Sequence, residues 1–175
     1  MTPHRHADDS ALARLFASGH HVRLLIAGQP PAGLALPATD HFERVVHLAR
    51  PGANGPIIAD PSRLPFIEAL FDRALVTTPL PATATRAELR EIWRILCPAG
   101  LALLVVKARR PWQWQAPGWT RETLEPVLDN AMFEVLDWQT ETIPDRWHLV
   151  LVCKRDGLRP AMIGRVEEAP TPATA

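Results

Sequence analysis

The sequence predicts an α/β fold: a mostly parallel β-sheet of about six or seven strands with an antiparallel last strand and helices on both faces. Short apolar runs alternate with segments of helical spacing, which is typical of a parallel sheet covered on both sides. Runs such as 22–27 and 101–106 are almost entirely apolar, as strands buried on both faces are. Two strand-like segments then close the chain without a helix between them, so we expect the last strand to be antiparallel.

The expected strands are short apolar or alternating segments that end at glycine, proline or charged residues. The run 101–106 is the strongest of them, and 55–59 is the weakest. A hairpin-like turn at 143–145 connects the final pair. The expected strands are 22–27, 44–48, 55–59, 71–77, 101–106, 133–141 and 146–154.

Three helices are expected at 8–17, 85–96 and 120–129. The first places apolar residues on one face, with Asp8 or Asp9 as a candidate N-cap. The second has an apolar stripe and is broken by the Pro-Ala-Gly sequence at 98–100. Thr120 is a plausible N-cap of the third, and acidic residues suit its first turns.

The length of 175 residues suits one domain. We expect this domain over 1–155 and a flexible tail rich in Pro, Ala and Thr over 156–175. The formal net charge is zero, so the chain has no general attraction for nucleic acid, and nucleic-acid partners are disfavoured. No apolar run approaches the ~18–20 residues of a membrane span, and the polar first ten residues lack the apolar core of a signal peptide. We therefore expect a cytoplasmic protein.

The chain has two cysteines, Cys97 and Cys153, beside apolar segments. Reduced, buried thiols are expected. Because both fall at the same end of the predicted sheet, a redox pair is the alternative. Cys-x-x-C and Cys/His clusters are absent, so no metal site is expected.

One segment carries a family resemblance. It contains Asp60, the sequence LPF at 64–66, FD at 71–72, and a helix that ends in RILCPAG at 94–100 before an apolar strand. This series resembles class I S-adenosylmethionine-dependent methyltransferases, in particular the methyltransferase type 11-like group. The close match covers about a third of the chain, and the strand order extends it loosely over 22–154. The resemblance implies a Rossmann-like methyltransferase fold and S-adenosylmethionine as cofactor.

The resemblance also implies where the cofactor would lie. In open parallel sheets, ligands bind at the carboxyl ends of the strands. In the family, an acidic residue at the position of Asp60 lies near the adenine, and the turn after the first strand passes under the amino-acid portion. Asp60 could instead cap the turn at Pro61, and Thr77 could instead hydrogen-bond the strand-end backbone. The implied cofactor-binding residues are Ala27, Gly28, Gln29, Asp60, Pro61 and Thr77.

The chain departs from the family pattern in its first third. The first turn should read GxGxG, whereas residues 27–33 read AGQPPAG, with only Gly28 well placed. Two prolines stiffen this loop and remove backbone donors. The following helix has only 33–42 in which to form, interrupted by Pro37. The acidic residue expected directly after the second strand is missing, and His47, Ala49 and Arg50 occupy that stretch. Two hypotheses remain: a methyltransferase acting on a small-molecule or unidentified acceptor, and a non-catalytic methyltransferase-like binding or scaffold protein that has lost cofactor binding.

The stretch 107–119 follows the fifth expected strand and contains three tryptophans and three cations. Related enzymes use this loop to frame the substrate, and its residues suit an aromatic or anionic substrate, a peptide or a lipid interface. Simple packing over the open end of the sheet is the alternative. The substrate-side candidates are Thr78, Arg109, Trp112 and Trp114; the sequence does not indicate a catalytic residue or an oligomeric state.

Overall fold

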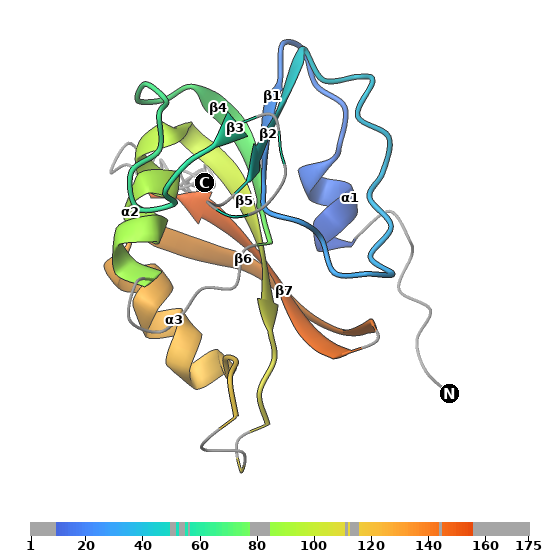
Figure 1. Cartoon of the computed structure of the whole chain (residues 1–175), viewed down its shortest axis with the longest axis vertical. Helices are drawn as coiled ribbons and strands as arrows, with labels where there is room; N and C mark the ends of the chain where they lie inside the picture. Colours follow the sequence, from blue (N-terminus) through green and yellow to red (C-terminus); the bar gives the residue numbers. More distant parts are fainter. Residues whose placement is uncertain are drawn as a thin grey trace, which may run out of the picture.

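Seven strands form one sheet in the order β3-β2-β1-β4-β5-β7-β6 (Figure 1). The structure is a computed structural model that describes residues 10–49, 52, 55, 57–77, 85–110, 112, 116–143 and 145–155. The strands are β1 (Arg23–Ala27), β2 (Arg44–Ala49), β3 (Ile57–Ile58), β4 (Phe71–Val76), β5 (Leu96–Lys107), β6 (Phe133–Ile143) and β7 (Asp145–Lys154).

All pairings among β1 to β5 are parallel. β7 runs antiparallel to both of its neighbours, β5 and β6. The prediction of a mostly parallel sheet with an antiparallel last strand is therefore confirmed. The predicted close connection between the last two strands is confirmed, because Ile143 pairs with Asp145.

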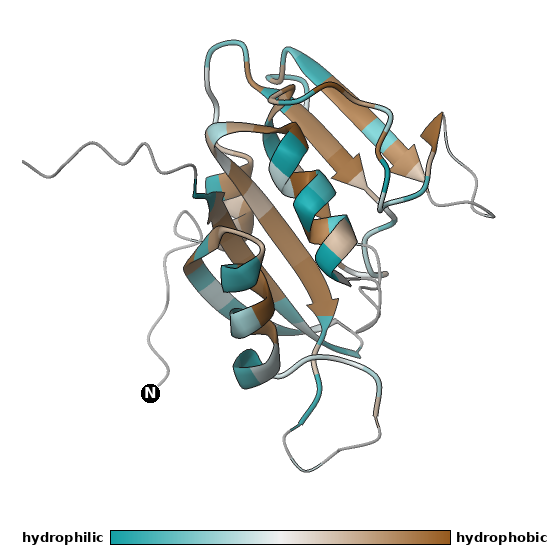
Figure 2. Ribbon diagram, turned by 90° about the vertical axis from the view of Figure 1, so that its left-hand side faces the viewer, coloured by the Kyte–Doolittle hydropathy of each residue, from teal (hydrophilic) through white to brown (hydrophobic). Residues whose placement is uncertain are grey.

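In the described part of the chain, three helices cover the two faces of the sheet: α1 (Ala11–Leu15), α2 (Thr85–Ile95) and α3 (Arg121–Asn130). Side chains alternate between faces along a strand. Leu24 and Ile26 of β1 pack with α1, whereas Leu25 and Ala27 pack with the cluster that includes α2 and α3. The central strands are accordingly hydrophobic along most of their length (Figure 2). The predicted helices on both faces are confirmed.

The first third of the chain is the least regular part. α1 is shorter than expected, and its N-cap is Ser10, whose hydroxyl accepts a hydrogen bond from the Ala13 amide at 3.0 Å. Because Ser10 is the N-cap, the expectation of an aspartate cap is wrong. Both aspartates fall among residues 1–9, outside the described residues. Residues 29–43 contain no helix, in line with the prolines in that connection.

The loop between β3 and β4 is fixed to α2 by an ion pair. Arg94 lies 2.7 Å from Glu91, and its guanidinium donates to the carbonyls of Phe66 at 2.8 Å and Leu64 at 3.2 Å. Glu91 accepts from the Leu64 amide at 2.8 Å. The hydrogen bond from Arg94 lowers the pKa of Glu91, against the opposing effect of burial. Two residues of α2 therefore position the LPF segment of the sequence.

Within the described residues neither cysteine forms a disulfide, and both are half-buried, so the expectation of buried thiols is wrong. The Cys97 thiol lies 3.1 Å from the Ala69 carbonyl, and that of Cys153 lies 3.5 Å from the Ala99 carbonyl. Burial raises the pKa of Cys97. Within the described residues, no helix is long and apolar enough to cross a membrane, and no group of three potential metal ligands gathers.

Candidate functional site

A small pocket lies at the carboxyl ends of β1, β2 and β4, against α2. Gly28 has a φ of 90°, a conformation that favours glycine, and it turns the chain away from β1 directly at the pocket. Its amide donates to the Leu48 carbonyl at 2.9 Å, and the Thr77 amide donates to the Ala27 carbonyl at 2.9 Å. The lining residues are Ala27, Gly28, Leu48, Ala49, Pro61, Leu64, Val76, Glu88, Leu89 and Ile92.

The pocket is narrow and mostly apolar. Its volume of about 20 Å³ suffices for about one water molecule. Glu88, near the start of α2, is the only acidic residue among the described lining residues, and it is 5% exposed. Sequence reasoning missed Glu88 and the apolar wall. The signal for the wall was the apolar stripe of the helix that includes Leu89 and Ile92.

The predicted cofactor-side residues divide into two groups. Ala27, Gly28 and Pro61 line the pocket, whereas Gln29 is exposed and lies outside the lining. Asp60 accepts from the Ser62 amide at 2.9 Å and from the Ser62 hydroxyl at 2.7 Å. This is the turn-capping geometry that the sequence left open as one alternative.

Thr77 is buried, and its hydroxyl lies 3.3 Å from the Ala27 carbonyl. This matches the strand-end hydrogen bond given above as the alternative to a ligand contact. Asp72, at the opposite end of β4, accepts from the Arg23 amide at 2.8 Å.

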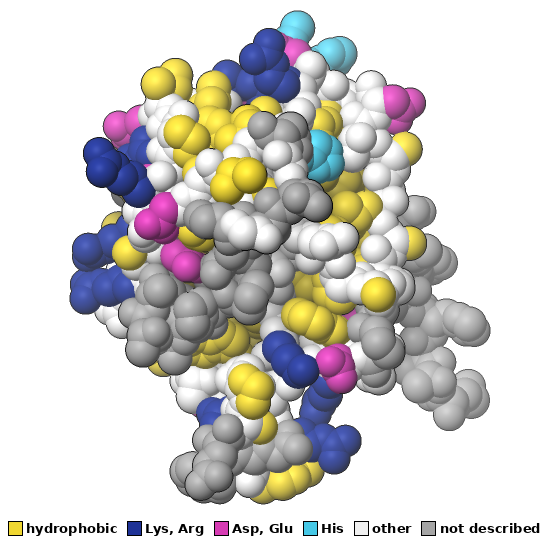
Figure 3. Space-filling view, in the orientation of Figure 1, with side chains coloured by type: hydrophobic (Ala, Val, Ile, Leu, Met, Phe, Trp, Pro, Cys, Tyr) yellow, Lys and Arg dark blue, Asp and Glu magenta, His cyan; other side chains and the backbone are white. Residues whose placement is uncertain are grey.

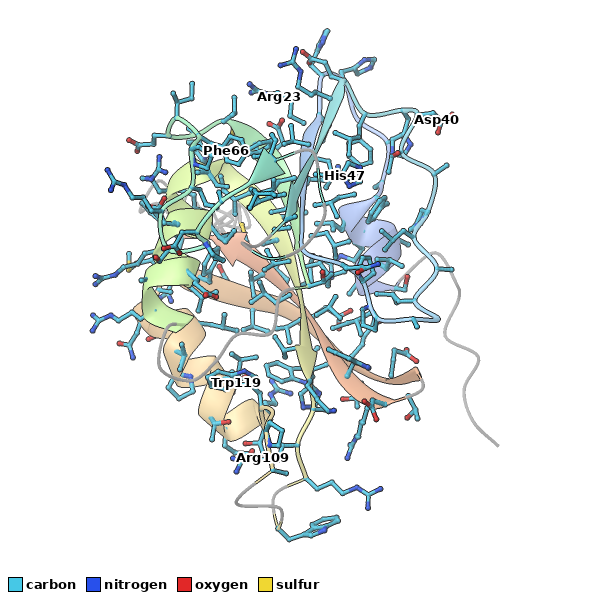
Figure 4. The ribbon with its side chains drawn as sticks, viewed as in Figure 1. Arg23, Asp40, His47, Phe66, Arg109 and Trp119 are labelled. Carbon is cyan, nitrogen blue, oxygen red and sulfur yellow. The ribbon has the colours of Figure 1, made fainter. Side chains whose placement is uncertain are left out.

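Two of the predicted substrate-side residues, Arg109 and Trp112, lie in the loop after β5 within the described residues. Its neck is closed by hydrogen bonds from the Trp119 amide to the Lys107 carbonyl and from the Arg109 amide to the Trp119 carbonyl, both 2.8 Å long. Trp119 is buried against the core, whereas Trp112 is 67% exposed and lies 5.5 Å from the Arg110 guanidinium. Figure 4 places Arg109 and Trp119 at the carboxyl end of β5. Thr78 and Trp114 lie outside the described residues.

A buried histidine lies beside this neck. His148 of β7 pairs with Val106 of β5, and its Nδ1 accepts from the Trp138 indole at 3.2 Å and lies 2.9 Å from the Thr140 hydroxyl. Burial lowers the pKa of His148; a contact with the Trp119 backbone opposes this shift. Sequence reasoning did not single out this residue, because its only signal was a polar position within an apolar strand.

No protein-family model and no curated protein matches the sequence. Solved structures do resemble it. A putative methyltransferase from Bacillus halodurans superposes with a TM-score of 0.63 at 13% identity, covering 82% of this chain and 97% of that one. The 1,6-didemethyltoxoflavin-N1-methyltransferase of Burkholderia thailandensis, solved with its substrate and S-adenosylhomocysteine, gives 0.61 at 18%, covering 83% and 77%.

This chain has the class I methyltransferase fold. A third similar structure with this fold, the [4+2]-cyclase SpnF, has a TM-score of 0.60 at 18% identity and covers 83% of this chain and 78% of that one. At these identities the likeness establishes the fold alone, so the activity has to be argued from the site.

The methyltransferase fold implies S-adenosylmethionine, and the described residues fit this cofactor only in part. Gly28 lets the backbone approach a ligand closely, and the pocket wall is apolar. A ribose diol, however, needs hydrogen-bond acceptors, and the sequence has no acidic residue between Glu43 and Asp60. A pocket that holds about one water also does not enclose a nucleoside.

Proposed function

We propose that this chain is an S-adenosylmethionine-dependent methyltransferase acting on a small-molecule acceptor. The observation that carries the proposal is the position of the pocket. It lies at the carboxyl ends of β1, β2 and β4, where the strand order reverses, which is where open α/β sheets bind ligands. The similar N1-methyltransferase, which is solved with a small-molecule substrate and S-adenosylhomocysteine, supports it.

In this proposal the chain acts mainly by positioning its ligands. Ala27, Gly28 and Gln29 would form the turn under the cofactor, with Asp60 and Pro61 at the rim and Thr77 at the end of β4. The cofactor, when bound, supplies the activated methyl group. We assign the acceptor side to Thr78, Arg109, Trp112 and Trp114, and the site of action to the cytoplasm.

Calorimetric titration with S-adenosylmethionine and S-adenosylhomocysteine tests the proposal. We expect binding tighter than about 100 µM, corresponding to roughly −5.5 kcal/mol. Asp60→Ala should abolish it. Ser62→Ala is the matched control, because it removes one partner of the turn and keeps the carboxylate. Absence of heat and of a thermal shift at millimolar ligand would overturn the proposal.

A specific observation favours a second candidate, a non-catalytic binding or scaffold protein with the same fold. The pocket holds about one water, and the diol acceptor is missing. The fold also hosts other chemistry, as the similar [4+2]-cyclase illustrates. Another similar structure is a putative methyltransferase in complex with the Haloferax volcanii Trm112 activator, so a protein partner is compatible with this fold. The same titration with S-adenosylmethionine distinguishes the two candidate functions, because only the methyltransferase requires binding of the cofactor.

A further inference from the structure

A second, larger groove lies at the amino ends of the parallel strands, at the opposite end of the sheet from the pocket beside Gly28. Its volume is about 460 Å³, within the range of small-molecule sites. Figure 4 shows Arg23 and Phe66 at this end of the molecule, and Figure 3 shows hydrophobic side chains on the surface there beside Lys or Arg. The groove is lined by Arg23, Glu43, Arg44, Val46, Ile57, Phe66, Leu70 and Phe71.

The floor of the groove is apolar and held in place. The rings of Phe66 and Phe71 meet edge to face with centroids 5.1 Å apart. The backbone of Phe66 is fixed by Arg94, and the Leu70 amide donates to the Ile95 carbonyl of α2 at 2.8 Å. Because this wall is tied to a helix, the groove is formed before any ligand arrives, which lowers the entropic cost of binding.

The rim carries one cation that lacks an ion-pair partner within the described part of the chain. The guanidinium of Arg23 lies 3.6 Å from Asp72, and the carboxylate of Glu43 lies 3.2 Å from His21. Arg44, the first residue of β2, is exposed and forms no salt bridge there. It projects on the same face of β2 as Val46, because the two are two residues apart in a strand. The guanidinium of Arg44 therefore lies beside the apolar floor of the groove.

We propose that this groove binds a small aliphatic carboxylate, with the hydrocarbon chain on the floor and the carboxylate on Arg44. An apolar chain gains free energy from leaving water, and a guanidinium binds a carboxylate through two parallel hydrogen bonds. The site is separate from the pocket beside Gly28, so it does not depend on methyl transfer.

Calorimetric titration of the full chain with decanoate, below its micelle concentration, tests this site. We expect saturable one-to-one binding to the wild type. Arg44→Gln should weaken it about tenfold, as loss of a charge-assisted hydrogen bond does. Val46→Trp should abolish it by filling the floor. Decyltrimethylammonium, with the same chain and the opposite charge, should bind more weakly than decanoate.

Arg90→Gln is the matched control, because Arg90 is an exposed arginine of α2 that does not line the groove. Thermal unfolding of each variant establishes that it is folded. Equal decanoate affinity of Arg44→Gln and wild type, equal weakening by Arg90→Gln, or equal binding of the cationic amphiphile would overturn the proposal. So would self-association through this groove in place of decanoate binding, detected as a dimer that Val46→Trp dissociates.

Discussion

His148 is a titratable residue inside a packed strand, and its hydrogen bonds specify its protonation state. Nδ1 accepts from the Trp138 indole, which is a donor only. Protonation of Nδ1 would remove that acceptor and place a charge in a site that is 7% exposed. The neutral ring, with its proton on Nε2, is therefore the form that the folded protein holds.

The titration of His148 should make the free energy of unfolding depend on pH. Burial holds the pKa of His148 below its ordinary value of 6.5. Below that value the unfolded chain binds the proton more readily than the folded one, so stability is complete above pH 6.5 and falls on acidification. We expect the free energy of unfolding to decrease from pH 7.5 to about 5.5 in urea titrations.

His148→Gln should make this decrease smaller, because glutamine does not titrate. His47→Gln is the matched control, since His47 is an exposed histidine of β2, and this variant should retain the full decrease. The same slope for His148→Gln and wild type would contradict the assignment.

At the scale of elements, the neck of the loop between β5 and α3 depends on one glycine. Gly118 has a φ of 129°, and a Cβ there would lie 2.8 Å from the Lys107 carbonyl. Gly118→Ala should therefore cost about 2–3 kcal/mol of unfolding free energy from combined backbone strain and steric clash. Denaturant unfolding measures this loss.

Gly52→Ala separates the two contributions. Gly52 also has a positive φ, of 89°, but a Cβ there would meet no atom of the described residues within 4 Å. This control should cost about 1 kcal/mol, from backbone strain alone. Equal losses in the two variants would show that the neck tolerates the added methyl group.

The tryptophans of this loop show where sequence reasoning stops. Trp112 and Trp119 share a loop and a residue type, yet one is exposed and the other is buried. Their difference depends on the Trp119 amide pairing with the Lys107 carbonyl, which no local pattern encodes. Asp60 is similar: the sequence allowed a ligand contact or a turn cap, and the position of Ser62 provides the cap.

Over the whole molecule, the strands and their order along the chain could be predicted well, because several independent features of the sequence indicate the same sheet. Apolar runs indicated the buried strands. Two consecutive strand-like segments with no helix between them indicated the antiparallel β7. The groove at the amino ends of the parallel strands could not be predicted from the sequence. Arg23, Arg44 and Phe66 are far apart in the sequence and form no motif, and only the parallel pairing of β1 with β2 brings the two arginines together.

Truncations test the predicted domain limit. Removal of 156–175, which composition indicates is a flexible tail, should change the unfolding free energy by no more than about 0.5 kcal/mol. Removal from Leu151 onward should prevent folding, because it deletes buried residues of β7 from the interior of the sheet. Circular dichroism during heating measures both. A shorter chain ending at Arg155 that fails to fold would show that the domain extends further.

The place of β7 between β5 and β6 has a consequence for synthesis. β5 and β6 are translated first, yet β7 is the strand that joins them. While the ribosome makes the last strand, the nascent chain carries two unsatisfied strand edges, and such edges invite aggregation. We expect the sheet to close only after β7 has been synthesised, so a chaperone that shields β5 and β6 should raise the yield of native protein more than one that binds β1 and β2.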